Sequence, residues 1–76
     1  MSTTEQDIKA QIAELLKVPE ERVEDETVLK ELTTDSFLLV EMVIGLQEVF
    51  HVRLVQDDLR EVQTVADLTS LFVSRA

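Results

Sequence analysis

The stretch that decides the fold is residues 32–50, which read LTTDSFLLVEMVIGLQEVF. A polar segment ends at Asp35, and apolar residues at helical spacing follow from Ser36 to Phe50. Aspartate is a preferred N-cap, because its carboxylate accepts a hydrogen bond from a free N–H group of the first helical turn. The sequence therefore predicts a helix over residues 36–50 with the Ser36 hydroxyl exposed in its first turn, where phosphate-bearing groups are favoured.

This predicted helix has two broad faces when successive residues are turned by about 100°. One face is apolar and is assigned to the core: Leu39, Met42, Val43, Leu46, Val49 and Phe50. The other mixes apolar, acidic and amide side chains: Phe37, Val40, Glu41, Ile44, Gln47 and Glu48. Exposed apolar groups beside charges indicate a surface that docks onto other proteins, since a purely structural helix presents a polar outer face. The alternative is that another segment of the chain covers the apolar members.

Composition excludes several classes of function. With 76 residues the chain is expected to form one domain, residues 1–76. The absence of cysteine excludes disulfides, thiol catalysis and cysteine metal sites. The net charge of −9 disfavours nucleic acid and anionic membrane surfaces, and it favours partners with basic patches. We find no signal-peptide pattern and no apolar run that could span a membrane, so a cytoplasmic location is expected.

The residues before the central helix predict a first helix and a long ordered loop. Ser2, Thr3 or Thr4 can cap a helix over residues 5–17, and Ser2 with Glu5 has the spacing of a capping box. Its core residues are Ile8, Ile12, Leu15 and Leu16. Pro19 stops it. Residues 18–35 form a carboxylate-rich loop with one helical turn near residues 28–31, held by Val23, Val28, Leu29 and Leu32. The loop lacks the spacing of a calcium-binding loop, and no metal site is predicted.

Two helical segments are predicted after residue 50. The first is a single turn capped by Asp57, with Leu59 and Val62 pointing inward. The second runs over residues 65–74 from a capping-box-like start at Thr64. Its inner side is Val65, Leu68, Leu71 and Phe72. The expected fold is all-α, a small bundle of three main helices and one short helix, with the long loop between helices one and two.

No catalytic constellation is evident in the sequence. His51 is the only histidine, and it stands at the opposite end of the central helix from Ser36, about 22 Å away at 1.5 Å per residue. A Ser–His pair within this helix is therefore excluded. The chain is expected to be a non-catalytic protein.

The residues around Ser36 resemble those of the acyl carrier proteins, whose signature is Asp-Ser-Leu at the start of the second helix. The resemblance is carried by Asp35-Ser36-Phe37, by residues 40–43 and 46–50, and by the order of helices over nearly the whole chain. It implies that Ser36 receives a 4′-phosphopantetheine arm from coenzyme A, transferred by a phosphopantetheinyl transferase. Acyl groups would then be held as thioesters on the arm, and Asp35 would help to present Ser36.

The resemblance also implies a monomeric, non-catalytic carrier within a multi-enzyme pathway. Its partners would be the transferase and acyltransferases, ketosynthases or acyl-activating enzymes with basic docking patches. The mixed face of the central helix would be the surface that they read, with Glu41 and Glu48 meeting basic residues. The main alternative from another class is a helical adaptor without the arm, in which Ser36 is only a helix-start residue. A helix-turn-helix DNA binder is disfavoured by the charge.

Three departures from the family pattern bear on the pathway. Thr33 stands where the family usually has glycine, and threonine disfavours positive φ, so the loop before Ser36 is expected to differ. Leu38 and Leu39 occupy positions that are often polar in fatty acid carriers, and Gln47 occupies a position that is commonly acidic. These changes favour polyketide or other specialised metabolite synthesis, with fatty acid synthesis and D-alanyl or aminoacyl transfer as alternatives. The sequence leaves open whether the bundle encloses its acyl cargo. The apolar side chains of Leu46, Leu54, Leu59 and Val62 are compatible with such a cleft.

Overall fold

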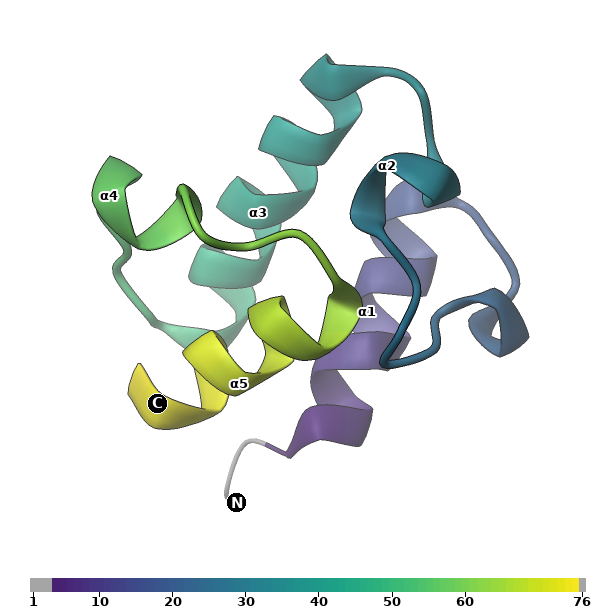
Figure 1. Ribbon diagram of the computed structural model, residues 1–76. Coiled ribbons are helices and arrows are strands. Elements are labelled where there is room, and N and C mark those ends of the chain that lie inside the picture. Colours follow the sequence, from purple (N-terminus) through teal and green to yellow (C-terminus); the bar gives the residue numbers. More distant parts are fainter. Residues whose placement is uncertain (1–3, 76) are drawn as a thin grey trace.

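The computed structural model describes residues 4–75, in which three main helices surround one apolar core (Figure 1). In chain order the elements are α1 (Glu5–Leu16), the 3-10 turn η1 (Glu20–Arg22), α2 (Leu29–Leu32), α3 (Ser36–Phe50), α4 (Gln56–Leu59) and α5 (Val65–Arg75). Within residues 4–75 there is no β-strand, so the predicted all-α fold is confirmed. The single turn expected in the long loop is α2. No helix in this range is long and apolar enough to cross a membrane.

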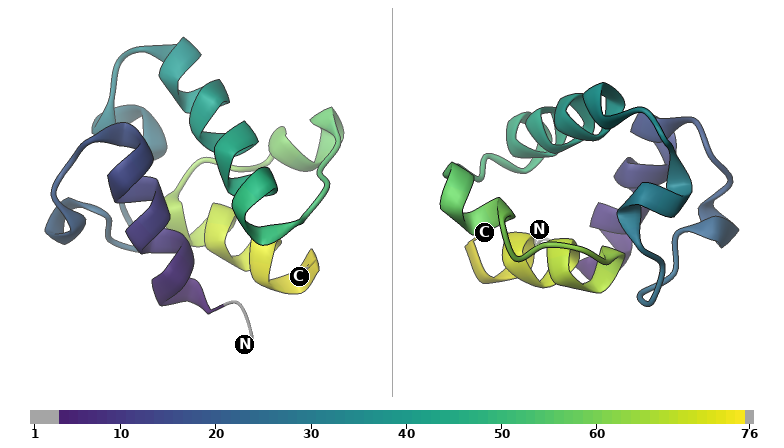
Figure 2. Two further views of the ribbon diagram at one scale, coloured as in Figure 1. Left: turned by 180° about the vertical axis from the view of Figure 1, so that it is seen from behind. Right: turned by 45° about the horizontal axis from the view of Figure 1, so that its top comes forward.

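The core is built from the apolar stripes of the three main helices. Its most deeply buried hydrophobic side chains are Ile8, Ile12, Met42, Leu46, Val65, Leu68 and Phe72. The Phe50 and Phe72 rings meet edge to face, with centroids 6.4 Å apart and planes at 68°, a favoured aromatic geometry. The views in Figure 2 show α3 and α5 packed on opposite sides of this core, with α4 beside the second half of α3.

The prediction that Val49 belongs to the core is wrong. Its side chain is 48% exposed, although it lies on the same stripe as Met42 and Leu46. α3 packs tightly on α1 at Gly45, where an added Cβ would lie 3.1 Å from Leu15 Cδ1. Val49 follows one turn later, in the last turn of α3, and half of its surface is left uncovered.

The helix boundaries follow local capping, with small corrections. Thr4 caps α1, and its hydroxyl and the Asp7 carboxylate form the capping box; Ser2 and Thr3 lie outside the described residues. α1 ends at Leu16 instead of Lys17, because Lys17 adopts a left-handed cap conformation (φ 59°). The expected Asp57 cap of α4 is wrong. Val55 occupies the cap position, and its N–H donates to the Asp58 carboxylate at 3.0 Å.

The long segment between α1 and α3 is held by more than its apolar side chains. Val23, Leu29 and Leu32 are buried as predicted, and Val28 is half-buried. In addition, backbone hydrogen bonds join this segment to the start of α5: Leu29 N–H to Gln63 C=O and Val65 N–H to Thr27 C=O, both 2.9 Å. These bonds hold the start of α2 beside the start of α5. α2 also forms one wall of a groove described below.

The negative charge of Asp67, at the start of α5, is expected to stabilise the folded protein. The Asp67 carboxylate accepts the N–H groups of Thr64 and Gln63, each at 3.1 Å, and these bonds hold the pKa of Asp67 below its ordinary value. Because the folded-state pKa is lowered, this contribution is complete above the unfolded-state pKa and is lost as pH falls through the folded-state pKa. We therefore expect Asp67→Asn to lower the melting temperature at about pH 7 and to approach the parent at about pH 2.

Thermal unfolding of both proteins, followed by circular dichroism across this pH range, measures that difference. Comparing the variant with the parent at each pH cancels the effect of the other carboxylates. A difference in melting temperature that stays constant with pH would contradict the assignment to the Asp67 charge.

Candidate functional site

Ser36 opens α3 on an exposed corner of the molecule. Asp35 precedes it in an extended conformation (φ −87°, ψ 103°), and its carboxylate accepts the Phe37 N–H at 2.9 Å. The predicted N-cap is therefore confirmed. Ser36 is exposed, and among residues 4–75 its hydroxyl has no hydrogen-bond partner. The positive end of a 15-residue helix favours a negatively charged group at this position.

The loop before Ser36 accommodates Thr33 without strain. Thr33 is extended (φ −155°, ψ 144°), and its Oγ1 accepts the Asp35 N–H at 3.2 Å. Within residues 4–75, positive φ angles occur only at Lys17 and His51. Threonine is therefore tolerated at this position, because the backbone is extended and needs no positive φ. Its hydroxyl also accepts a hydrogen bond from Asp35, the residue that caps α3.

The mixed face of α3 is exposed, as the pattern predicted. Phe37 is 66% exposed, Val40 56% and Ile44 48%, and Glu41 and Glu48 are also exposed. The alternative that another segment covers these apolar side chains is therefore wrong for residues 4–75. The apolar and acidic side chains lie together on a single helix that begins at Ser36.

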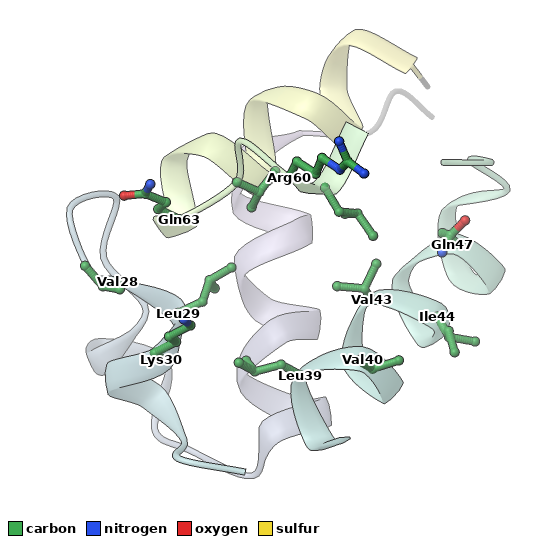
Figure 3. A pocket seen from close by; sticks show the side chains of 12 residues that line it. Val28, Leu29, Lys30, Leu39, Val40, Val43, Ile44, Gln47, Arg60 and Gln63 are labelled. Atoms are coloured by element: carbon green, nitrogen blue, oxygen red, sulfur yellow. The ribbon is translucent and has the colours of Figure 1, made fainter. Parts of the chain in front are cut away.

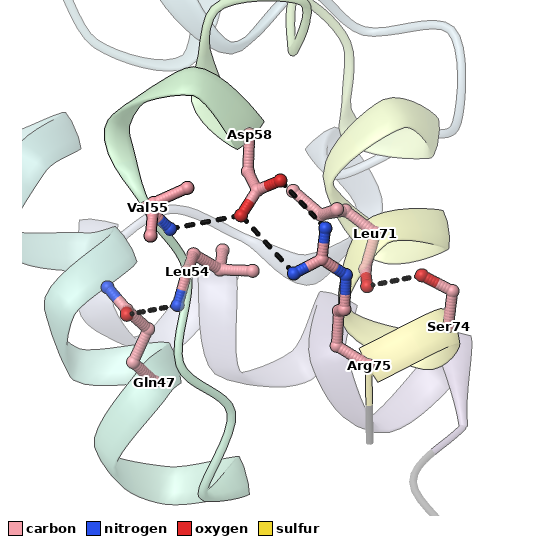
Figure 4. Close-up of polar contacts among 7 residues, drawn as sticks. All are labelled: Gln47, Leu54, Val55, Asp58, Leu71, Ser74 and Arg75. Atoms are coloured by element: carbon pink, nitrogen blue, oxygen red, sulfur yellow. Dashed lines mark hydrogen bonds and ion pairs between the residues drawn. The ribbon is translucent and has the colours of Figure 1, made fainter.

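Gln47 is half-buried and holds the turn that follows α3 (Figure 4). Its Oε1 accepts the Leu54 N–H at 2.9 Å, and its backbone C=O accepts the N–H groups of His51 and Val52. His51 itself adopts the left-handed cap conformation at φ 55°. Gln47 therefore has a structural contact that its place on the predicted docking face did not indicate.

The short helix α4 is tied to α5 by polar contacts. The Asp58 carboxylate accepts the Val55 N–H and pairs with both terminal nitrogens of the Arg75 guanidinium, at 2.7 and 3.3 Å (Figure 4). The backbone N–H of Val55, followed by the Arg75 side chain, lowers the pKa of Asp58. No residue of α4 is fully buried, so these bonds are important for its position.

An apolar groove of about 650 Å³ runs beside α3 (Figure 3). α2 forms one wall and α3 the other, and the groove is completed by Leu59, Arg60, Val62 and Gln63. Its aliphatic side chains are Val28, Leu29, Leu39, Val40, Val43, Ile44, Leu59 and Val62. The groove begins about one helical turn from Ser36. Of the four residues that could permit a sheltered cargo, Leu59 and Val62 line it, whereas Leu46 is buried in the core.

Sequence reasoning did not find the polar members of this groove. Lys30 and Arg60 contribute cations, and Gln47 and Gln63 contribute amides. They come from four separate segments, so no local pattern joins them. Among residues 4–75 no cluster of histidine and carboxylate side chains is suited to hold a metal ion.

The described residues thus place an exposed serine at a helix start, close to an apolar groove. Comparison with known proteins gives the family. Residues 6–72 match the family described as "Phosphopantetheine attachment site". The acyl carrier protein of Chlamydia trachomatis serovar D is 33% identical over 72 residues, covering 93% of this chain and 94% of that one. That of Wolinella succinogenes is 35% identical over 63 residues, covering 82% and 83%.

The chain therefore belongs to the acyl carrier protein family, whose members are carriers and not catalysts. The family's prosthetic group is covalently bound 4′-phosphopantetheine. When bound, it supplies a thiol, which this cysteine-free chain does not have. The residues present fit the group, since an exposed hydroxyl stands at a helix N-terminus with an apolar groove close by.

Proposed function

We propose that residues 1–76 form a single carrier domain and that Ser36 is its attachment site. The observation that carries this proposal is the exposed Ser36 directly after the Asp35 cap, with a hydroxyl that bonds no residue between 4 and 75. A phosphopantetheinyl transferase would join Ser36 Oγ to the phosphorus of the phosphopantetheine portion of coenzyme A. The hydroxyl proton is released, and adenosine 3′,5′-bisphosphate leaves. Asp35 supports this step by fixing the backbone from which Ser36 projects.

The docking surface in this proposal is the mixed face of α3: Phe37, Val40, Glu41, Ile44, Gln47 and Glu48. Three exposed apolar side chains supply contact area that partners can desolvate, and the two carboxylates attract basic residues and orient the encounter. The partners are the transferase and acyltransferases, ketosynthases or acyl-activating enzymes. As a monomeric carrier, the protein raises the effective concentration of a tethered acyl group at each partner in turn.

The pathway that we infer is polyketide or other specialised metabolite synthesis. Support comes from three positions of α3 that depart from the pattern expected of a fatty acid carrier. Leu38 is 37% exposed, Leu39 lines the groove, and Gln47 occupies a position that is commonly acidic. Fatty acid synthesis and D-alanyl or aminoacyl transfer are the alternatives.

Replacing Gln47 with glutamate, the commonly acidic residue at this position, tests this pathway assignment. A malonyltransferase of bacterial fatty acid synthesis is expected to use the parent, in its phosphopantetheine form, about tenfold less efficiently (kcat/KM) than its own carrier. Gln47→Glu should recover severalfold of this loss, mainly at low salt, because an added carboxylate speeds encounter with a basic patch. The variant keeps an oxygen that can accept the Leu54 N–H.

Glu48→Gln is the matched control, because it removes an exposed carboxylate one residue away on the same face. It should lower kcat/KM further. Equal efficiency of the parent and the enzyme's own carrier would instead assign the chain to fatty acid synthesis.

A further inference from the structure

The segment between α2 and Ser36 is anchored in the core at its start and exposed at its end. Leu32, the last residue of α2, has a buried side chain, and Thr33 directly after it is half-buried. Thr34 and Asp35 are exposed, as is Ser36. Because core packing does not hold these exposed residues, the position of the serine depends on local hydrogen bonds.

These hydrogen bonds form a series that begins at Thr33 and passes through Asp35. The Asp35 N–H donates to Thr33 Oγ1 at 3.2 Å, and the Phe37 N–H donates to Asp35 Oδ1 at 2.9 Å. The Asp35 C=O accepts the Leu39 N–H at 3.3 Å. Asp35 therefore holds the peptide unit before Ser36 through its carbonyl and the peptide unit after it through its carboxylate. Asp35 is held in turn by the Thr33 hydroxyl.

The backbone of Thr33 restricts the same segment in a second way. Its φ of −155° and ψ of 144° lie in the extended region, which a β-branched side chain favours. Glycine, the usual residue of the family at this position, has no hydroxyl and populates many more backbone conformations. Threonine thus supplies both an acceptor for the Asp35 N–H and a narrower range of conformations for the residues before Ser36.

We propose that Thr33 is a positioning residue for the modification of Ser36, acting through Asp35. The inference rests on the proposed attachment at Ser36 and leaves the bonds made and broken in that step unchanged. Transfer requires Ser36 Oγ to approach the phosphorus of coenzyme A in one geometry, and a nucleophile held near that geometry reacts faster than one that samples several. Thr33 is not part of the docking surface on α3. Its hydroxyl therefore contributes to the transfer step and not to binding of the transferase.

Single-turnover loading separates transfer from binding. The protein without its arm is mixed with saturating coenzyme A and with increasing concentrations of a broad-specificity transferase in excess, and loading is followed by intact mass. The maximum rate constant then reports the transfer step, and the half-saturating transferase concentration reports binding. Product release does not affect either value, because each protein molecule is loaded once.

Thr33→Val keeps the β-branched shape and removes the acceptor. It should lower the maximum rate constant about fivefold, the effect of one exposed hydrogen bond, and should leave the half-saturating concentration within about twofold of the parent value. Thr33→Ser restores a hydroxyl and should recover most of the loss. Thr34→Val is the matched control, since Thr34 is an exposed neighbour whose hydroxyl bonds no residue between 4 and 75. It should load as the parent does.

A maximum rate constant of Thr33→Val equal to that of the parent would overturn the proposal. An equal loss in Thr34→Val, or a Thr33→Ser variant as slow as Thr33→Val, would also overturn it, because the effect would then not come from the Thr33 hydroxyl. So would a change confined to the half-saturating concentration, which would place Thr33 in binding. Thermal unfolding checks that each variant is folded at the assay temperature. A failure of the proposed attachment is distinguishable, since the parent itself would then gain no phosphopantetheine on Ser36.

Discussion

Replacing Ser36 with alanine is expected to abolish phosphopantetheine loading completely. The modification needs an oxygen that can attack phosphorus, and alanine has none. Ser36 is exposed, its hydroxyl bonds no other described residue, and the cap of α3 is supplied by Asp35. The variant should therefore fold as the parent does, with a melting temperature within a few degrees of it. Intact mass after incubation with coenzyme A and a broad-specificity transferase gives the result.

Ser74→Ala is the matched control for this loss. Ser74 is also an exposed serine on a main helix, and its hydroxyl donates to the Leu71 carbonyl at 2.9 Å. This variant should gain the mass of one phosphopantetheine, as the parent does. Loading of Ser36→Ala to the parent level would place the attachment site elsewhere in the chain.

Ile44→Asp should lower the transferase's kcat/KM for this carrier by about 30-fold. This factor corresponds to the loss of a contact worth about 2 kcal/mol at the centre of an interface. Ile44 lies on the mixed face of α3 between Val40 and Glu48, and it is 48% exposed. A carboxylate there removes apolar contact area and has to be desolvated when the partner binds. The assay uses the protein without its arm, so binding of cargo in the groove does not affect the result.

Val49→Asp is a closely matched control within the same helix. Val49 is also 48% exposed, but it lies on the opposite side of α3. The same new charge there should change kcat/KM by less than about threefold, apart from any effect on stability, which thermal unfolding of both variants measures. If both variants lose activity equally, α3 has no docking face and the effect is one of charge or stability.

The helical fold and the cap before Ser36 were predictable because their signals are local. The change from a polar segment to helical periodicity at Asp35 and Ser36 indicates a capped helix start within a few residues. Thr64 and Asp67 do the same for α5. Periodicity also places the core residues of α1 and α5 without knowledge of their partners. The family resemblance and the structure agree on these elements for that reason.

The features that the sequence did not predict depend on contacts between distant segments. Asp58 and Arg75 are 17 residues apart, and no pattern links them. The isolated β-bridge between Val28 and Thr64 joins the long loop to the start of α5, and no local pattern predicts this pairing. The groove depends on how α2 and the segment after α4 are placed around α3. Val49 shows the reverse case: it lies on the stripe assigned to the core, but tertiary packing leaves it 48% exposed.

Locating the arm by fragmentation mass spectrometry is the most direct test of the central claim that Ser36 carries it. The protein is loaded with coenzyme A and a transferase, digested, and each peptide is searched for the added phosphopantetheine and for the pantetheine fragment that it releases. Attachment at Ser36 predicts that the modification occurs on Ser36 alone. Modification of another hydroxyl, such as Thr34, or no modification of the folded protein, would contradict it.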